Sequence, residues 1–303
     1  ASDVYKRQEI KLVATSPEDA RFREKEFLEA VAIYANQDIR CHVGKQRAVQ
    51  WAKERGEQLL WVAARDRPCH GGEQRRPYTI EDKIRWLGYH EKECASLPGW
   101  LPLAKGMPVA LGDHLDRSKK QLLRGRTATI HGWVLHEEEV VGDGDEEVLM
   151  HLPRVIVLDF HTKEWHLPGW EPGLYPIFPS KGRKWFLDGY RKHPVLSVKR
   201  TQFMITPALA VTAHSAQGRT MAAVIADLER GRGVSWMASY VAITRVRRRE
   251  DLLIFRPFDR KPYNAGEMPG TKKLLQVLRG EKVDWDEWEE ELMPRDQCER
   301  CRR

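Results

Sequence analysis

Two stretches in the last third of the chain decide the expected fold: VTAHSAQGRT, residues 211–220, and YVAITR, residues 240–245. The first follows the apolar run ALA at 208–210 and leads into a loop. Between the two lies MAAVIADL, an apolar run that ends near Asp227 and indicates a buried strand. The second belongs to a helical pattern at 235–247, and DLLIF at 251–255 indicates a final strand. Strand, loop, strand, helix and strand at these spacings predict a parallel α/β sheet.

The N-terminal part of the chain continues this pattern. VAIYAN at 31–36 is typical of a buried parallel strand, KQRAVQWAKERG at 45–56 indicates a helix that stops at Gly56, and LLWVAARD at 59–66 indicates the next strand. Strand, helix and strand then predict a right-handed parallel crossover. Asn36 is interpreted as a helix cap, or alternatively as a residue that positions nucleotide or nucleic acid.

The middle of the chain has a different character. Residues 101–199 contain short β-type segments separated by turns, which predict a small β-barrel inserted into the α/β domain. The acidic residues 137–147 fit a hairpin loop, and VIVLDF at 155–160 fits a barrel strand. The tryptophans of this region are expected to pack its core rather than to stack on bases; they are Trp133, Trp165, Trp170 and Trp185.

These segments divide the chain into four parts. The α/β domain is assigned to residues 25–100 and 200–260, with the barrel at 101–199 between its two halves. Residues 1–24 form an N-terminal segment whose start is expected to be non-native or disordered. Residues 261–303 form a C-terminal tail with a short helix in KKLLQVL at 272–278.

Composition narrows the possible partners. The formal net charge is +7 and the pI is about 9.1, which favours phosphate-rich partners, although a solvated surface without a partner fits charge alone equally well. No apolar run approaches the ~20 residues of a membrane span. The five cysteines are irregularly spaced, so we expect no disulfide framework and a reducing compartment, the nucleus or the cytoplasm. Cys298 and Cys301 are at best half of a zinc site, and no metal site is assigned.

The pattern T-x-H-x-x-Q-G-x-T, a strand, and then Y-V-A-x-[ST]-R resembles superfamily-1 helicases of the RecD-like branch, which includes the Pif-type enzymes. The phrases LPLAKGMPVALGDHLD and LLRGRTATI within 101–130, and QFMITPALA at 202–210, are similar to the same family. The resemblance implies the second RecA-like domain, of the P-loop-NTPase type, with an inserted SH3-like barrel. It also implies the C-terminal part of an ATP-dependent DNA helicase that translocates on single-stranded DNA and unwinds duplex junctions.

The resemblance carries roles for seven residues. Arg245 matches the arginine finger that neutralises charge on the transferring phosphoryl group. Gln217 and Gly218 match positions near the nucleotide. The positions that contact the single-strand backbone are Thr212, His214, Ser215 and Thr220. Two departures weaken this backbone contact: Ser215 stands where many relatives have Lys, and Ala216 replaces a common Ser.

His214 and the arginines that follow Arg245 also have structural interpretations. Outside this context His214 would be interpreted as a satisfied, partly buried histidine. Arg247, Arg248 and Arg249 are interpreted as a solvated helix end.

The parts that hold ATP are missing from the sequence. The pattern G-x-x-x-x-G-K-[ST] does not occur, because Gly44-Lys45 lacks the first glycine and the hydroxyl. Asp159 ends an apolar run but is followed by Phe160, so no Asp-Glu pair for Mg²⁺ is found. We therefore expect ATP and Mg²⁺ to be bound mainly by a first RecA-like domain of the same protein, with this chain inactive alone. The alternative is a non-catalytic nucleic-acid-binding or scaffold remnant of a helicase.

Overall fold

The computed structural model describes residues 19–69, 79–187, 196–229, 236–260 and 269–283. The chain divides into two units, residues 1–258 and 259–303. The second unit contains α7 (Pro269–Leu278), which confirms the helix predicted in the tail. Among the described residues, no helix combines the length and the apolar character needed to cross a lipid bilayer.

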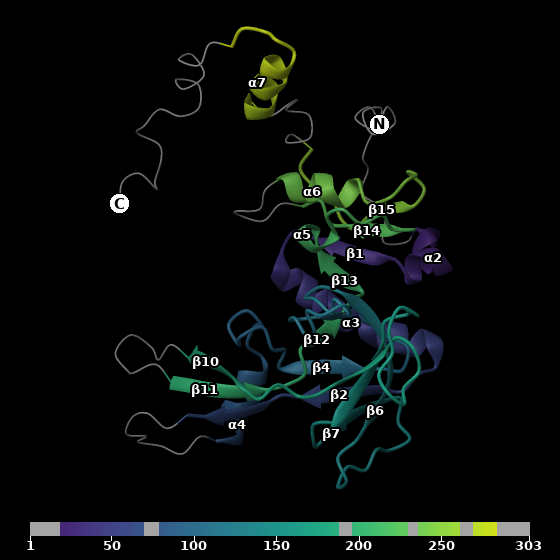
Figure 1. Ribbon diagram of the computed structural model, residues 1–303, viewed down its shortest axis with the longest axis vertical. Coiled ribbons are helices and arrows are strands. Elements are labelled where there is room, and N and C mark those ends of the chain that lie inside the picture. Colours follow the sequence, from purple (N-terminus) through teal and green to yellow (C-terminus); the bar gives the residue numbers. More distant parts are fainter. Residues whose placement is uncertain (1–18, 70–78, 188–195, 230–235, 261–268, 284–303) are drawn as a thin grey trace. The chain divides into compact units, whose positions relative to one another are not determined.

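A four-stranded parallel sheet lies in the first unit (Figure 1). Its order is β13 (Ala210–Thr212), β1 (Val31–Tyr34), β14 (Val224–Ala226) and β15 (Leu252–Ile254), and every neighbouring pair is parallel. The strands are short runs of buried apolar residues, as expected for a sheet covered on both faces. The three strands predicted around the two quoted stretches and the strand predicted at 31–36 are therefore confirmed, and with them the α/β class.

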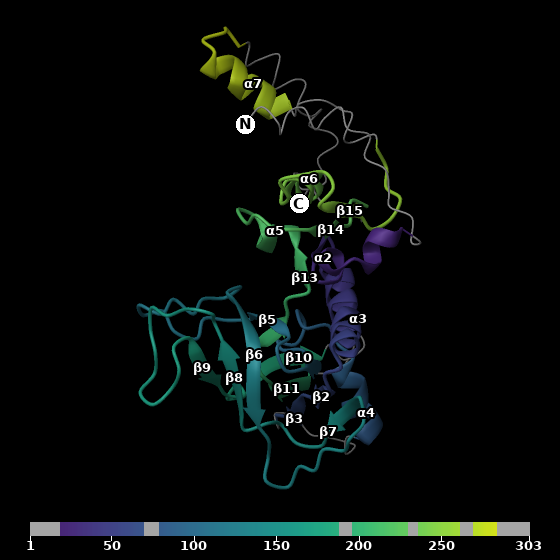
Figure 2. The ribbon, with the colours of Figure 1, turned by 90° about the vertical axis from the view of Figure 1, so that its right-hand side faces the viewer.

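Helices cover this sheet. They are η2 (Ala20–Arg23), α2 (Lys25–Leu28), α3 (Gln37–Arg55), α5 (Ala213–Ala216) and α6 (Trp236–Ile243). The long helix α3 packs against β1 and β13 (Figure 2). It also packs against three strands outside this sheet: β12 (Ile205–Pro207), β2 (Leu59–Ala63) and β4 (Trp100–Leu103). This one helix therefore connects the parallel sheet with the other sheets of the unit.

The ends of α3 are set by two residues that the sequence identifies. The Asn36 side chain accepts a hydrogen bond from the Asp38 N–H at 2.7 Å, and Gly56 ends the helix with a φ of 64°. A capping Asn satisfies one of the free N–H groups of the first turn, and glycine adopts the left-handed conformation without a Cβ clash. The interpretation of Asn36 as a cap is therefore confirmed.

The strand predicted at 59–66 exists but belongs to a different sheet. β2 (Leu59–Ala63) pairs antiparallel with β4 (Trp100–Leu103) and parallel with β7 (Glu146–Leu149). The predicted parallel crossover from 31–36 to 59–66 is therefore wrong. Leu60 and Val62 are buried in a second core, and an apolar run does not state which sheet it joins.

A five-stranded antiparallel sheet forms most of the middle region. Its order is β12 (Ile205–Pro207), β5 (Pro108–Leu111), β6 (Thr127–Val134), β8 (Val155–Asp159) and β9 (Leu174–Ile177). Within the described ranges β12 and β9 each pair on one side only, so closure into an SH3-like barrel stays a prediction. Residues 137–145 form no helix or strand and lie in the connection between the antiparallel strands β6 and β8, which agrees with the predicted hairpin loop, whereas residues 146 and 147 begin β7, which pairs with β2.

The third sheet joins distant parts of the sequence. β10 (Arg183–Leu187) and β11 (Leu196–Thr201) form a hairpin ladder, and β3 (Arg65–Pro68) adds to the other side of β11. Helix α4 (Ile80–Leu87) lies in the same region and begins with a capping box of Thr79 and Asp82.

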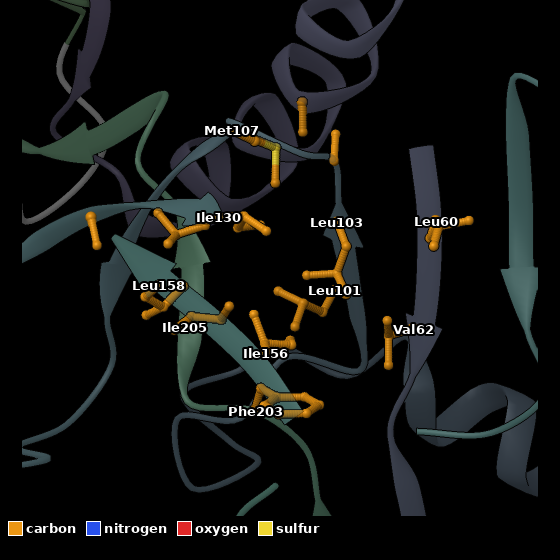
Figure 3. Packing of buried hydrophobic residues seen from close by; sticks show 14 of the residues in the cluster. Leu60, Val62, Leu101, Leu103, Met107, Ile130, Ile156, Leu158, Phe203 and Ile205 are labelled. Atoms are coloured by element: carbon orange, nitrogen blue, oxygen red, sulfur yellow. The ribbon is translucent and has the colours of Figure 1, made fainter. Parts of the chain in front are cut away.

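The largest core lies between α3 and the strands of the middle region (Figure 3). Leu101 and Leu103 of β4, Ile156 of β8 and Phe203 are all buried in it. Three of the four tryptophans pack as expected. Trp133 and Trp165 lie against this core and Trp185 is buried in a separate cluster, whereas Trp170 is 39% exposed.

Candidate functional site

The two quoted stretches meet on one side of the parallel sheet. Helix α5 carries the first stretch and α6 the second, and the two helices pack against each other. Helix α5 also contacts β1, and α6 contacts β14, so both lie over the centre of the sheet. Residues more than 20 positions apart are thereby brought together.

The first stretch begins with a small hydroxyl pair. Thr212 ends β13 and caps α5: its Oγ1 accepts from the Ser215 N–H at 3.4 Å and lies 3.0 Å from the Ser215 Oγ. Ala213 and Ala216 are buried beneath, which fixes the short helix on the sheet. His214 and Ser215 are exposed. Of the residues predicted to contact nucleic acid, Thr212 and Ser215 are therefore linked to each other.

A tight turn follows α5. The Gln217 N–H donates to the His214 carbonyl at 3.3 Å and the Arg219 N–H to the Ala216 carbonyl at 3.2 Å. Gly218 has a φ of 76°, and a Cβ there would meet no atom within 4 Å. Glycine is therefore favoured at this position by backbone conformation rather than by lack of space.

Arg245 fastens the second stretch to this turn. Its guanidinium donates to the Arg219 carbonyl at 3.2 Å and, more weakly, to the Ala216 carbonyl at 3.5 Å. In return the Met221 N–H donates to the Arg245 carbonyl at 2.8 Å. Gln217 and Gly218 lie between the two carbonyl acceptors in sequence, so Arg245 and the predicted nucleotide-side residues form one cluster.

The remaining bonds of Arg245 hold its stem. Nε donates to the Val241 carbonyl and Nη2 to the Thr244 hydroxyl, both at 2.8 Å. All four acceptors are neutral, and no carboxylate in the described part of the chain forms an ion pair with this half-buried guanidinium. Its positive charge is therefore not neutralised, and the two longest bonds are those to the turn.

The other predicted site residues of this turn have exposed side chains. Gln217 and Thr220 are exposed, and neither these two nor His214 has a side-chain hydrogen bond to another described residue. The neighbouring Arg219 donates to the Thr127 hydroxyl of β6 at 3.5 Å. The cluster is thus polar and basic, with hydroxyl, amide and imidazole groups available to a ligand. The individual roles of these residues in binding nucleotide or DNA stay predictions.

A buried acid at the end of β14 was not singled out from the sequence. Asp227 is 2% exposed and receives two bonds of 2.9 Å from Arg256, which follows β15. The Asp227 carboxylate raises the pKa of Arg256, while burial raises the pKa of the adjacent Tyr34 to about 12. Its signal in the sequence is an acid directly after an apolar strand. Because both carboxylate oxygens accept hydrogen bonds from Arg256, the Asp227 side chain joins the end of β14 to the residue that follows β15 closely. We therefore interpret Asp227 as a structural residue and not as a metal ligand.

No protein-family model and no curated protein matches the sequence. Solved structures do. Pif1 helicase from Candida albicans matches with a TM-score of 0.50 and 15% identity, over 92% of this chain and 54% of that chain. Bacteroides Pif1 in complex with ADP-AlF3 and single-stranded DNA matches with a TM-score of 0.45 and 14% identity, over 92% of this chain and 50% of that one.

At 15% identity, the likeness to the Candida enzyme shows the fold alone. The chain has the fold of a Pif1 helicase over nearly all its length, which confirms the resemblance to Pif-type helicases at that level. It spans about half the length of the solved structures that it matches.

Proposed function

We propose that the chain is the C-terminal part of an ATP-dependent DNA helicase and supplies one side of its ATP site. The observation that carries the proposal is the bonding of Arg245 to the turn that bears Gln217 and Gly218. The fold shared with a Pif1 helicase supports it. In this proposal a first RecA-like domain of the same protein holds ATP and Mg²⁺ on its phosphate-binding loop.

Arg245 acts in this proposal as an arginine finger. A guanidinium meets phosphate oxygens with a rigid fork of N–H groups and stabilises charge that develops on the transferring phosphoryl group. The two bonds to the turn, at 3.2 and 3.5 Å, are the weakest that Arg245 makes. When the two domains close, phosphate oxygens replace the Ala216 and Arg219 carbonyls, while the 2.8 Å bonds continue to hold the stem.

Single-stranded DNA is the proposed polymer partner. The exposed His214, Ser215 and Thr220 offer hydrogen-bond donors to phosphate oxygens, and such contacts hold a backbone without reading its sequence. Thr212 acts through Ser215, because its hydroxyl orients that side chain. Since Ser215 carries no charge, its own contact contributes affinity with little dependence on salt.

The test of the finger uses the complete protein with Arg245→Ala. We expect ATP turnover to fall by about 10³-fold or more, because arginine fingers contribute 10³–10⁵ to turnover. Nucleotide binding should change far less. Arg248→Ala is the matched control, since Arg248 is an exposed arginine three residues away. Normal turnover in Arg245→Ala, or an equal loss in the control, would refute the role.

The DNA contact can be tested on the 303-residue chain itself. Fluorescence anisotropy with a labelled single-stranded oligonucleotide should show weaker binding for His214→Ala/Ser215→Ala than for the unchanged protein. Exposed Lys105 is remote from this stretch in sequence, and Lys105→Ala serves as control. Unchanged affinity in the double variant would remove DNA contact from this stretch.

A non-catalytic nucleic-acid-binding or scaffold protein is the second candidate, motivated by the lack of a phosphate-loop pattern in the sequence. The two candidates differ in the coding sequence upstream of residue 1. An in-frame G-x-x-x-x-G-K-[ST] segment supports the motor, and its absence from the whole reading frame supports the scaffold.

A further inference from the structure

The segment between β6 and β8, residues 135–154, is called the acidic excursion below. A cluster of two histidines and two glutamates lies where its two ends meet. His136 and Glu138 follow β6, while His151 lies between β7 and β8. The Glu138 Oε2 is 4.0 Å from the His136 Nδ1 and 3.7 Å from the His151 Nε2. One ligand atom from each of these three residues lies within 4.8 Å of the other two.

The fourth member, Glu139, fixes the orientation of His151. Its side chain is 2% exposed and accepts hydrogen bonds from the backbone N–H groups of Met150 and His151, at 2.8 and 2.6 Å. It also lies 3.1 Å from the His151 Nδ1. A buried carboxylate on Nδ1 favours the tautomer with its proton there, which leaves the lone pair on Nε2, facing Glu138.

His136 lies on the other side of Glu138. Its Nδ1 accepts the Glu138 N–H at 3.3 Å, a long bond that a metal bound at Nδ1 replaces. The rings of His136 and His151 are stacked, with centroids 4.6 Å apart and planes 15° from parallel. Imidazole lone pairs lie in the ring planes, so the His136 ring turns out of this stack for both rings to reach one metal, while the bond to Glu139 keeps His151 oriented.

The surrounding backbone is tied down as well. The Arg154 N–H donates to the Val134 carbonyl at 2.8 Å, and the Arg154 side chain pairs with Glu137 at 2.8 Å. These bonds join the end of β6 to the start of β8 beside the cluster. Residues 137–147 contain seven carboxylates and no Lys or Arg, so the excursion attracts cations although the whole chain is basic.

We propose that His136, Glu138 and His151 bind a divalent transition metal, with Zn²⁺ the best fit. Two imidazoles and one carboxylate suit Zn²⁺, whereas Mg²⁺ and Ca²⁺ prefer oxygen ligands alone. Zn–N and Zn–O distances of about 2.0–2.2 Å in tetrahedral geometry place neighbouring ligand atoms about 3.3–3.5 Å apart. The two separations from Glu138 Oε2, 3.7 and 4.0 Å, exceed this spacing by a few tenths of an ångström, and the two histidine nitrogens lie within 4.8 Å of each other.

The metal links the two ends of the acidic excursion through three protein ligands and leaves its fourth coordination position open. Glu138 is 75% exposed, so water or another small ligand reaches the fourth position of the metal from solvent. Bridging residues 138 and 151 closes the intervening segment onto the β6–β8 pair. The site depends on neither the ATP nor the DNA part of the proposed function.

The experiment titrates the purified 303-residue chain with Co²⁺ and reads the visible d–d absorption, followed by displacement with Zn²⁺. The background variant Cys298→Ser/Cys301→Ser removes the C-x-x-C thiols as competing ligands. We expect one tetrahedral Co²⁺ per chain in this background, and a rise in melting temperature with Zn²⁺. His151→Gln should remove both signals. Glu139→Gln should weaken binding by about 10–100-fold, the usual effect of losing a partner that orients a ligand.

The control is His166→Gln, an exposed histidine outside the cluster, which should bind Co²⁺ as the background variant does. Metal-free melting temperatures of all variants show whether each one folds. Tetrahedral Co²⁺ absorption that survives His151→Gln, or that is lost equally in His166→Gln, overturns the site. Absence of tetrahedral Co²⁺ in a folded background variant overturns it as well.

Discussion

Arg200 supports the clearest prediction about stability, because it is a fully buried charge with every partner identified. Arg200 is 0% exposed and binds both oxygens of Asp66, at 2.9 and 2.7 Å. It also donates to the Trp86 carbonyl at 2.7 Å and the Leu97 carbonyl at 3.3 Å, and its guanidinium lies 5.1 Å from the Trp185 ring centroid. One side chain thus joins β11 and β3 to α4 and the segment after it.

The replacement Arg200→Met keeps much of the apolar volume and removes the charge. The carboxylate of Asp66, whose side chain is 2% exposed, is then left in the interior without its partner. Removing one member of a buried ion pair costs about 3–5 kcal/mol, mostly because the remaining charge stays uncompensated. At about 2–4 °C per kcal/mol for a domain of 150–250 residues, the melting temperature should fall by roughly 6–20 °C.

Thermal and urea unfolding followed by circular dichroism measure this loss. Arg55→Met is the matched control, because Arg55 pairs with Glu29 with both side chains nearly half exposed, and exposed pairs contribute about 0–1 kcal/mol. The double variant Arg200→Met/Asp66→Leu should recover part of the loss, since it removes the orphaned charge. The reasoning fails if Arg200→Met costs no more than Arg55→Met, or if the double variant is less stable than the single one.

Three further predictions follow from local geometry. Asn36→Ala should lower the unfolding free energy by about 1 kcal/mol through loss of the α3 cap, whereas the mid-helix Gln50→Ala should not, in urea titrations of both. Burial raises the pKa of Cys41 from 9.0 to about 12, so its contribution to stability is complete below pH 9 and is lost as the pH rises toward 12; Cys41→Ala should flatten that part of the pH–stability curve. Gly218→Ala should cost about 1–2 kcal/mol because its φ of 76° is left-handed, while Gly132→Ala, equally open around its Cβ, should cost less by thermal melting.

The sequence predicted the parallel sheet well because each of its strands is a short apolar run beside a recognisable turn. Val224–Ala226 and Leu252–Ile254 could be located from such runs alone. Strand β2 could not be assigned to its sheet, since its apolar pattern is the same whether its neighbour is β1 or β4. The choice is made by the pairing of Leu60 with Leu103 and of Val62 with Leu101 in β4, which are contacts between residues far apart in the sequence that no local pattern encodes.

The cluster around Arg245 was only partly predictable. The residue types could be read from the sequence. The acceptors that hold the guanidinium to the turn are the main-chain carbonyls of Ala216 and Arg219, and every residue has such a carbonyl, so the sequence does not indicate which ones are used. The cluster of His136, Glu138 and His151 was not predicted from the sequence, for a different reason. Its members belong to both ends of an excursion that was predicted to be a hairpin loop, and the pairing of β7 with β2 determines where those ends lie.

The arginines of the first unit differ in what neutralises them, and this difference favours Arg245 as the group that meets a phosphate. Arg200 and Arg256 are held by the buried carboxylates of Asp66 and Asp227, so their charges are already balanced. Arg47, like Arg245, has no ion pair within the described ranges, but it donates at 2.6 and 3.2 Å to the Ala30 and Leu28 carbonyls beside β1, and its Nε is buried without an acceptor.

Burial also lowers the pKa of Arg47, which marks a charge held away from solvent for a structural purpose. Arg245 is fastened to an exposed turn by bonds of 3.2 and 3.5 Å, which a charged acceptor from solvent can replace at small cost. A phosphate oxygen that displaces these carbonyls gains a charge-assisted hydrogen bond and releases the turn bearing Gly218. Binding of an anion by Arg245 and movement of that turn should therefore occur together, and the proposed helicase function requires such a coupling between the binding of ATP and the contact with DNA.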